Sequence, residues 1–176
     1  MIEAQTEHAS VAAASSLGQA HASPLPQVVA AAGIWPAAAE GWRRARRIMV
    51  VEDDPLLQLD LVHLLEAGGH EVVARAGRGE VALSRFASAQ AAGMVPDLVL
   101  MDIHLGRGMD GVAAAMAIRA LDAGVAIAFR SAHVDEATRA RASAVSPLAF
   151  LDKVVPIEAV LRLVMSAPAR ESDGRR

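Results

Sequence analysis

Residues 48–55 read Ile48-Met49-Val50-Val51-Glu52-Asp53-Asp54-Pro55, an apolar run that stops abruptly at three acidic residues. Four consecutive apolar residues without polar alternation predict a strand that is buried on both faces and ends before Glu52. Pro55 suits the first turn of a helix, and the leucines that follow recur at helical spacing up to Gly68-Gly69, where the helix should end. These residues therefore predict a buried strand that leads into a helix.

The same pattern of strand and helix recurs four more times along the chain. The expected strands lie at residues 71–76, 98–101, 125–129 and 148–151, and the expected helices at residues 79–92, 110–121, 135–144 and 156–165. Because these strands are too apolar to alternate, they predict a parallel sheet with helices on both faces. Right-handed crossovers then give a doubly wound α/β fold of five strands. In such a sheet, functional side chains gather at the carboxyl ends of the strands.

Composition excludes several classes of function. Of the 176 residues, 53% are hydrophobic and 21% are charged, with a formal net charge of −3, so the chain can form a core and lacks the basic excess typical of nucleic-acid binding. The absence of cysteine excludes disulfides, thiolate nucleophiles and cysteine-ligated metals. No apolar stretch is long enough for a membrane span, and residues 1–7 contain no Lys or Arg. We therefore expect a soluble cytoplasmic protein without membrane contact or direct DNA binding.

Residues 1–46 differ in character from the rest of the chain. They are rich in Ala, Ser and Gln, show no sustained period, and end in a cluster of arginines. One interpretation is a low-complexity, disordered or partly helical extension, which includes the case of a start codon assigned too far upstream. The other is a docking segment in which residues 28–39 form an apolar partner-binding helix, although Pro36 counts against a long helix. At the other end, residues 168–176 are expected to form a flexible polar tail.

Charged and hydroxyl side chains follow four of the five expected strands. They are Glu52, Asp53 and Asp54 after the first strand, Asp102 after the third, Ser131 after the fourth and Lys153 after the fifth. Crowded carboxylates repel one another unless a cation neutralises them, and an all-oxygen ligand set suits Mg²⁺ or Mn²⁺. An Asp beside such a metal and a lysine can attack phosphorus to form an aspartyl phosphate. The strand ends therefore predict a metal-dependent phosphoryl site.

Five motifs in register on successive strand ends resemble the receiver domain of two-component response regulators. The motifs are Val50-Val51-Glu52-Asp53-Asp54-Pro55, Leu98-Val99-Leu100-Met101-Asp102, Met109-Asp110-Gly111, Phe129-x-Ser131-Ala132 and Phe150-Leu151-Asp152-Lys153. Each motif alone is weak, and the combination is specific. The resemblance covers residues 47–167 and implies a flavodoxin-like sheet with strand order 2-1-3-4-5.

The resemblance implies a role for each acidic residue of the site. Glu52 and Asp53 match the acidic pair that holds Mg²⁺, Asp53 directly and Glu52 through water. Asp102 matches the phosphoacceptor, which also contributes to the metal site, and the backbone carbonyl of His104 would complete the metal shell. Asp54 is instead expected to be a helix N-cap or a solvated charge.

The resemblance also implies roles for the remaining site residues. Ser131 and Lys153 match the hydroxyl and the lysine that hold the phosphoryl oxygens. Phe150 matches the aromatic residue whose rotation reports phosphorylation, although permanent packing in the core is an equally ordinary role for such a side chain. His104 and His133 should flank the entrance for attacking water, where they either tune hydrolysis of the phosphoryl group or are merely exposed.

The sequence departs from the family pattern in three places. Val154, not proline, follows Lys153, so either the Lys153–Val154 bond is trans in a rebuilt loop or a strained cis bond is retained. The loop after Asp102 contains residues 106–108, Gly-Arg-Gly, and is one residue longer than the common form. Ser131 stands where threonine is commoner, which keeps the hydroxyl.

These observations lead us to expect a stand-alone receiver that accepts a phosphoryl group on Asp102 from a sensor histidine kinase or a histidine phosphotransfer protein. It would be a switch, not a turnover enzyme, and would act on an unknown downstream protein through the surface of the last two helices and the last strand. One alternative is a phosphorylation-independent interaction module with the same fold. Another is a phosphatase of the haloacid-dehalogenase type, which wants an Asp where this chain has His104.

Overall fold

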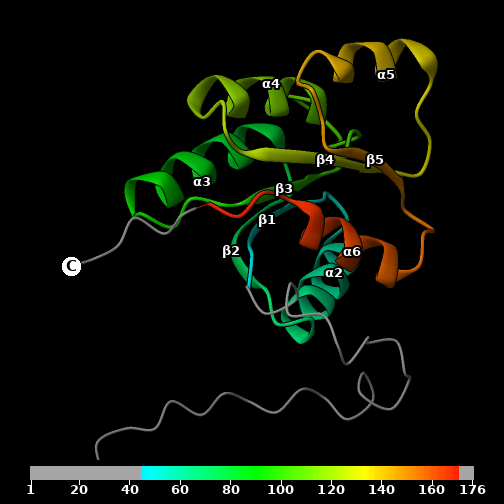
Figure 1. The fold of residues 1–176 in the computed structure, drawn as a ribbon. Helices are drawn as coiled ribbons and strands as arrows, with labels where there is room; N and C mark the ends of the chain where they lie inside the picture. Colours follow the sequence, from blue (N-terminus) through cyan, green and yellow to red (C-terminus); the bar gives the residue numbers. More distant parts are fainter. Residues whose placement is uncertain (1–44, 171–176) are drawn as a thin grey trace, which may run out of the picture.

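A computed structural model describes residues 45–170 and places five strands in one parallel sheet (Figure 1). The strands are β1 (Arg47–Val51), β2 (Glu71–Ala76), β3 (Leu98–Met101), β4 (Ala126–Ser131) and β5 (Ala149–Asp152). Their order in the sheet is β2-β1-β3-β4-β5, and every neighbouring pair is parallel. The doubly wound five-stranded fold predicted from the sequence is confirmed.

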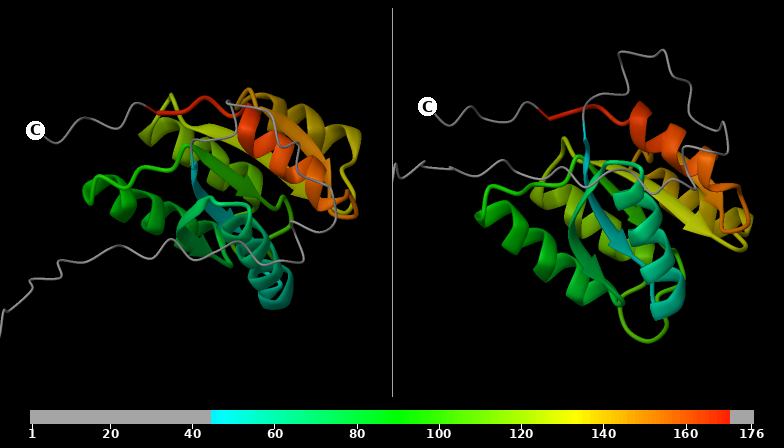
Figure 2. Two further views of the ribbon diagram at one scale, coloured as in Figure 1. Left: turned by 60° about the horizontal axis from the view of Figure 1, so that its bottom comes forward. Right: turned by 90° about the horizontal axis from the view of Figure 1, so that it is seen from below.

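Helices cover both faces of the sheet. The helices are α2 (Pro55–Ala67), α3 (Gly79–Ala91), α4 (Gly111–Leu121), α5 (Glu136–Ser143) and α6 (Ile157–Ser166). Helices α2 and α6 lie on one face, and α3, α4 and α5 lie on the other (Figures 1 and 2). None of the helices in residues 45–170 combines the length and apolar character that a membrane span requires.

Aspartates that precede helices fix where those helices begin. The side chain of Asp54 accepts hydrogen bonds from the backbone N–H groups of Leu56 and Leu57 at the start of α2. Asp110 and Asp135 cap α4 and α5 in the same way. Each cap satisfies backbone donors that have no partner within the helix. The expectation that Asp54 is a helix cap is confirmed.

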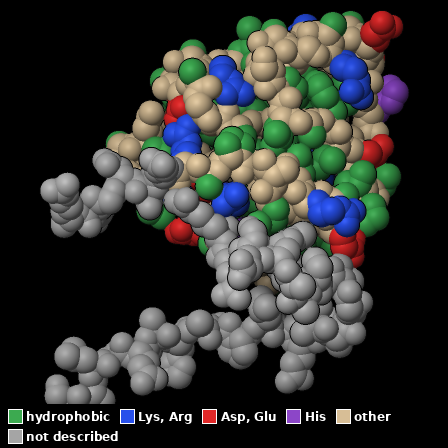
Figure 3. All heavy atoms as spheres, in the orientation of Figure 1, with side chains coloured by type: hydrophobic (Ala, Val, Ile, Leu, Met, Phe, Trp, Pro, Cys, Tyr) green, Lys and Arg blue, Asp and Glu red, His purple; other side chains and the backbone are tan. Residues whose placement is uncertain are grey.

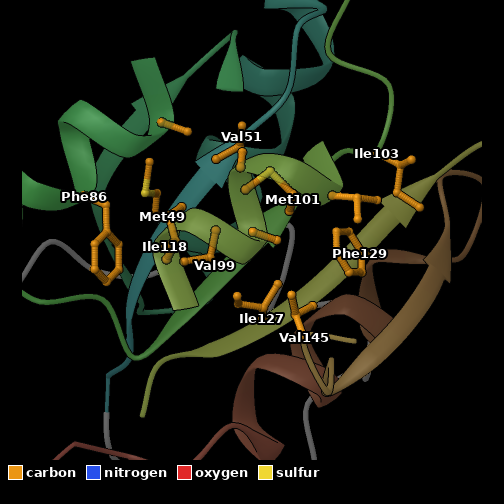
Figure 4. Close-up of a cluster of buried hydrophobic side chains, with 14 of the residues drawn as sticks. Met49, Val51, Phe86, Val99, Met101, Ile103, Ile118, Ile127, Phe129 and Val145 are labelled. Atoms are coloured by element: carbon orange, nitrogen blue, oxygen red, sulfur yellow. The ribbon is translucent and has the colours of Figure 1, made fainter. Parts of the chain in front are cut away.

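The strands divide their side chains between two separate cores. Side chains of β1, β3 and β4 alternate, so that Met49, Val99 and Ile127 pack under α3, α4 and α5 (Figure 4). Their sequence neighbours, including Ile48 and Leu98, pack against α2 and α6. We call these the α3–α5 core and the α2–α6 core. Because successive strand residues point to opposite faces, the core that a residue joins is fixed by its position along the strand.

Arg46, which directly precedes β1, contacts the end of α6. Arg46 is buried, and its guanidinium donates hydrogen bonds to the backbone carbonyls of Met165 and Ala167 after the last turns of α6. At the other terminus, the guanidinium of Arg170 pairs with Asp122. Both interpretations of the N-terminal segment concern residues 1–46, of which residues 1–44 lie outside the described residues.

The strand boundaries agree with the sequence to within two residues. The largest difference is β4, which extends through Ser131 instead of ending at residue 129. The reason is pairing, because Ser131 stands opposite Asp152 and its carbonyl accepts a hydrogen bond from the backbone N–H of Lys153. The pairing of β4 with β5 therefore continues beyond the apolar residues of β4.

Gly111, at the start of α4, lies against the backbone that carries Asp102. A Cβ at Gly111 would overlap the carbonyl oxygen of Asp102, and the backbone N–H of Gly111 donates to Ile103 O. We predict that Gly111→Ala lowers the free energy of unfolding by about 2 kcal/mol or more, because neither backbone segment can move away freely. The matched control is Gly77→Ala, whose Cβ would meet its nearest atom at an ordinary 3.6 Å and should change stability by less than about 1 kcal/mol. Urea unfolding measures both, and equal losses would contradict the close approach.

His70 makes stability depend on pH. Burial lowers the pKa of His70, and the charge of Arg46 lowers it further, while His70 Nδ1 accepts a hydrogen bond from the Arg46 backbone N–H. As the pH falls through about 6.5, the unfolded chain gains a proton that the folded chain resists, so the free energy of unfolding should fall. Urea unfolding at pH 7.5 and pH 5.5 should show a smaller loss for His70→Asn than for the wild-type chain. His63→Asn, at an exposed position of α2, should keep the wild-type loss.

Candidate functional site

The registers of the sheet bring four strand ends to one edge. Val51 stands opposite Met101, Met101 opposite Phe129, and Phe129 opposite Phe150. The residues that follow each of these positions therefore lie side by side at the carboxyl edge of the sheet. They form an open hollow lined by Glu52, Asp53, Asp54, Pro55, Leu57, Asp102, His104, Ser131, Ala132 and Lys153.

Lys153 links the two buried carboxylates of this edge. Its Nζ lies 2.7 Å from Glu52 Oε1 and 2.7 Å from Asp102 Oδ2. The side chains of Glu52 and Asp102 are only 2% and 3% exposed, so water screens their charges poorly. Because two buried carboxylates repel each other, one ammonium between them lowers the free energy of the site.

Burial and charge shift the protonation of these groups. Burial raises the pKa of Glu52 more than the hydrogen bond from Lys153 lowers it, and the charge of Asp102 adds to the rise. Burial alone would lower the pKa of Lys153, but the hydrogen bonds to Asp102 and Glu52 outweigh it and raise that pKa. Lys153 is therefore a cation at neutral pH, held where negative charge is concentrated.

Asp53 completes a group of three carboxylates that suits a metal ion. One carboxylate oxygen each from Glu52, Asp53 and Asp102 lies within 4.8 Å of the others. Asp53 is exposed, whereas the other two are buried, so the group opens toward solvent. Three hard oxygen donors around an open position are a ligand set for Mg²⁺ or Mn²⁺.

Ser131 and His104 also line the hollow, and His133 lies next to Ser131. Ser131 Oγ donates a hydrogen bond to the backbone carbonyl of His133 and lies 3.1 Å from His104 Nδ1. The backbone N–H of His104 donates to Asp102 Oδ1 at 3.0 Å. The residues predicted from the strand ends thus meet around Asp102.

Comparison with known proteins assigns the family of this domain. A family model described as the response regulator receiver domain matches residues 48–165. The chain belongs to this family. The resemblance inferred from the five motifs is confirmed, and the fold provides the acidic edge at which receiver domains typically bind Mg²⁺.

Relatives and solved structures agree with this assignment. The transcriptional regulatory protein PdtaR of Mycobacterium tuberculosis is 32% identical over 134 residues, which cover 73% of this chain and 62% of PdtaR. The chemotaxis protein CheY of Bacillus subtilis is 35% identical over 88 residues, which cover 50% of this chain and 68% of CheY. The signal receiver domain of a modulated diguanylate cyclase from Desulfovibrio desulfuricans superposes with a TM-score of 0.63 at 30% identity, over 70% of this chain and 94% of that domain.

Phe150 lies at the boundary between core and surface of the receiver domain. Its half-buried ring stacks on Phe129 of the α3–α5 core with ring centroids 5.5 Å apart. The guanidinium carbon of Arg139 on α5 lies 4.6 Å from the centroid of the Phe150 ring on β5. The ring therefore contacts both the core and an exposed cation, so this geometry is compatible with both a core role and a switch role.

The loop after Lys153 is rebuilt without the proline common in receiver domains. No peptide bond in residues 45–170 is cis, so the Lys153–Val154 bond is trans. The side chain of Asp152 accepts a hydrogen bond from Val154 N, and Arg130 Nη2 donates to the Lys153 carbonyl at 2.9 Å. Sequence reasoning missed Arg130, and the signal that could have revealed it is a charged residue between the apolar run that ends at Phe129 and the hydroxyl of Ser131.

Charges elsewhere on the receiver domain are mixed. On the face that Figure 3 shows, acidic and basic side chains are interspersed and do not gather by sign. Arg141 of α5 and Asp110 form an exposed pair, whose atoms also lie 2.7 Å apart. This pair has the same length as the Lys153–Asp102 pair but a different environment.

We predict that the Lys153–Asp102 pair couples more strongly than the exposed pair. A double-mutant cycle with Lys153→Met and Asp102→Asn should give a coupling free energy of about 1–3 kcal/mol, because the pair is mostly shielded from water. The same cycle with Arg141→Met and Asp110→Asn, at equal distance, should give less than about 1 kcal/mol. Asn retains the capping oxygen at position 110. Urea unfolding of the wild-type chain, the four single variants and the two double variants measures both cycles, and similar coupling energies would show that burial does not set the strength of the Lys153 pair.

Proposed function

We propose that Asp102 accepts a phosphoryl group from the phosphohistidine of a sensor histidine kinase or a histidine phosphotransfer protein. The observation that carries this proposal is the position of Asp102, a buried carboxylate with an ammonium 2.7 Å away and with carboxylate oxygens of Glu52 and Asp53 within 4.8 Å. Membership of the receiver family supports it, because receiver domains act as signalling switches. We propose residues 47–167 as the unit that carries this role.

The proposed metal ligands are the carboxylates of Glu52, Asp53 and Asp102, with the backbone carbonyl of His104. The three carboxylates fit Mg²⁺ or Mn²⁺ because their oxygens already lie within 4.8 Å of one another. When bound, such an ion offsets negative charge on the phosphoryl oxygens. Asp53 is the exposed member and would be the first ligand that an ion from solvent meets.

In the proposed transfer, a carboxylate oxygen of Asp102 forms a bond to phosphorus while the bond from phosphorus to the donor imidazole breaks. The imidazole leaves with the electron pair of that bond. Lys153 is placed to hold a phosphoryl oxygen, because its Nζ already donates to Asp102 Oδ2. The ammonium would thereby stabilise negative charge on the phosphoryl group during transfer.

Ser131 and Phe150 would report the phosphoryl group to the surface. Ser131 Oγ donates to the His133 carbonyl, and a donation to a phosphoryl oxygen would replace that hydrogen bond. The freed segment precedes α5, whose Arg139 lies over Phe150. We propose that these changes alter the surface formed by α5, β5 and α6, which a downstream protein then reads.

The proposal is tested by chemical phosphorylation. Incubation of the full chain with acetyl phosphate and Mg²⁺ should give a phosphoprotein of retarded mobility in a phosphate-affinity gel. Asp102→Ala should remove the retarded band, because the acceptor carboxylate is gone. Removal of Mg²⁺ with EDTA should reduce the rate by at least about tenfold, since the charge on the phosphoryl oxygens is then less well neutralised.

The matched control is Asp54→Asn, which keeps the cap of α2 and should retain the retarded band. Labelling that persists in Asp102→Ala would place the acceptor elsewhere. A chain that is never labelled, and that binds a partner equally well with and without beryllofluoride, would instead support the phosphorylation-independent module.

A further inference from the structure

Arg130 is the charged residue of β4, whose other residues are apolar except for Ser131. It follows Phe129 on β4, so the alternation of the strand directs it toward the α2–α6 core, opposite to Ser131. There it lines a hollow between the two helices together with Asp60 and apolar side chains that include Leu57 and Leu61. Its side chain is only 14% exposed. A guanidinium is costly to bury on an apolar face unless it is paired with polar groups.

The contacts of Arg130 are to the two residues that surround Asp102. Nη2 donates to the backbone carbonyl of Lys153 at 2.9 Å, and Nη1 lies 3.6 Å from Glu52 Oε2. The latter separation is too long for a hydrogen bond, and Nη1 has no other acceptor within the described residues. Arg130 therefore holds the loop of Lys153 through Nη2, and its Nη1 is an unused hydrogen-bond donor next to Glu52.

We propose that Arg130 is a positioning residue for Lys153, an inference that rests on the proposed function of Asp102. Its hydrogen bond to the Lys153 carbonyl fixes the trans loop from which Nζ reaches Asp102. A planar guanidinium can donate to two acceptors at once, which a lysine at the same position cannot do with the same geometry. An arginine at this position can therefore hold the Lys153 carbonyl while it directs a second donor toward Glu52.

The unused donor, Arg130 Nη1, has a second consequence for the site. In this structure Glu52 Oε1 accepts from Lys153 Nζ. A phosphoryl group on Asp102 adds negative charge that competes for the same ammonium, and the Glu52 side chain is only 2% exposed in this structure. A small approach of Arg130 Nη1 to Glu52 Oε2 would then keep the buried carboxylate paired. Arg130 would let Lys153 turn to the phosphoryl group without leaving Glu52 unpaired.

Two quantities that respond in opposite directions test this role. Arg130→Met removes a cation close to the proposed metal ligands, so Mg²⁺ should bind about three- to tenfold more tightly by isothermal titration calorimetry. At saturating Mg²⁺, the rate of phosphorylation of the same variant by acetyl phosphate should fall by about tenfold, because Lys153 is less well placed. A variant whose site is merely loosened would lose Mg²⁺ affinity and rate together.

A second variant separates the charge of Arg130 from its hydrogen bond to the Lys153 carbonyl. Arg130→Lys keeps the charge, so its Mg²⁺ affinity should stay within about twofold of the wild-type value, while its phosphorylation rate falls as in Arg130→Met. This smaller change also serves if Arg130→Met does not fold. Arg141→Met removes an exposed cation on α5 and should change neither quantity.

The outcomes distinguish this inference from the function on which it rests. A wild-type chain that is not phosphorylated on Asp102 would overturn the proposed function. A wild-type chain labelled on Asp102, with rates of Arg130→Met and Arg130→Lys within twofold of it, would overturn only the role of Arg130. Parallel losses of Mg²⁺ affinity and rate in both variants would also overturn it.

Discussion

The site depends on one ammonium that stands between two buried carboxylates. Glu52 and Asp102 follow neighbouring strands whose last residues are opposite each other, so the parallel register forces them together. Neither side chain is more than 3% exposed, and their repulsion is offset by Lys153, which comes from the far end of the domain sequence. A buried carboxylate without a cation would take up a proton or disturb the packing around it. The position of Lys153 is therefore a condition for the folded edge as well as for its chemistry.

The alternation of strand residues divides this edge into two halves. The alternation that places strand residues in the α2–α6 core continues through Glu52, Asp102, Arg130 and Lys153. Their side-chain and backbone contacts join these four residues to one another. Ser131 and Phe150 have the opposite phase and belong with the α3–α5 core. In the proposed function, the charges of the site are therefore balanced on the α2–α6 side of the sheet. The residues that report phosphorylation lie on the α3–α5 side. Arg130 and Ser131 are adjacent in β4, which makes this strand the shortest link between the two sides.

Sequence reasoning correctly predicted the features that produce a local pattern in the sequence. It did not predict the features that depend on how side chains pack. Strand ends are visible because an apolar run gives way to charge, so Glu52, Asp102 and Lys153 could be brought to one edge by the rule for parallel sheets. The contact between Ser131 and His104 and the stacking of Phe150 depend on rotamers, which no spacing encodes. The sequence alone does not decide whether the Lys153–Val154 bond is cis or trans. It shows that proline is missing, but it does not show the hydrogen bonds of Asp152 and Arg130 that hold the loop.

The loop after Lys153 shows how one substitution in a family pattern is accommodated by groups far from it in sequence. With Val154 in place of proline, the backbone N–H at this position is a donor, and the Asp152 side chain accepts from it. The carbonyl of Lys153 is likewise occupied, by an arginine 23 residues earlier in the chain. Both hydrogen bonds involve charged side chains, which are stronger partners than neutral ones, so they restrict the loop by interactions where proline restricts it by its ring. Because Arg130 also lies beside Glu52, the residue that holds this loop is also a neighbour of the acidic edge, a link that a proline ring would not provide.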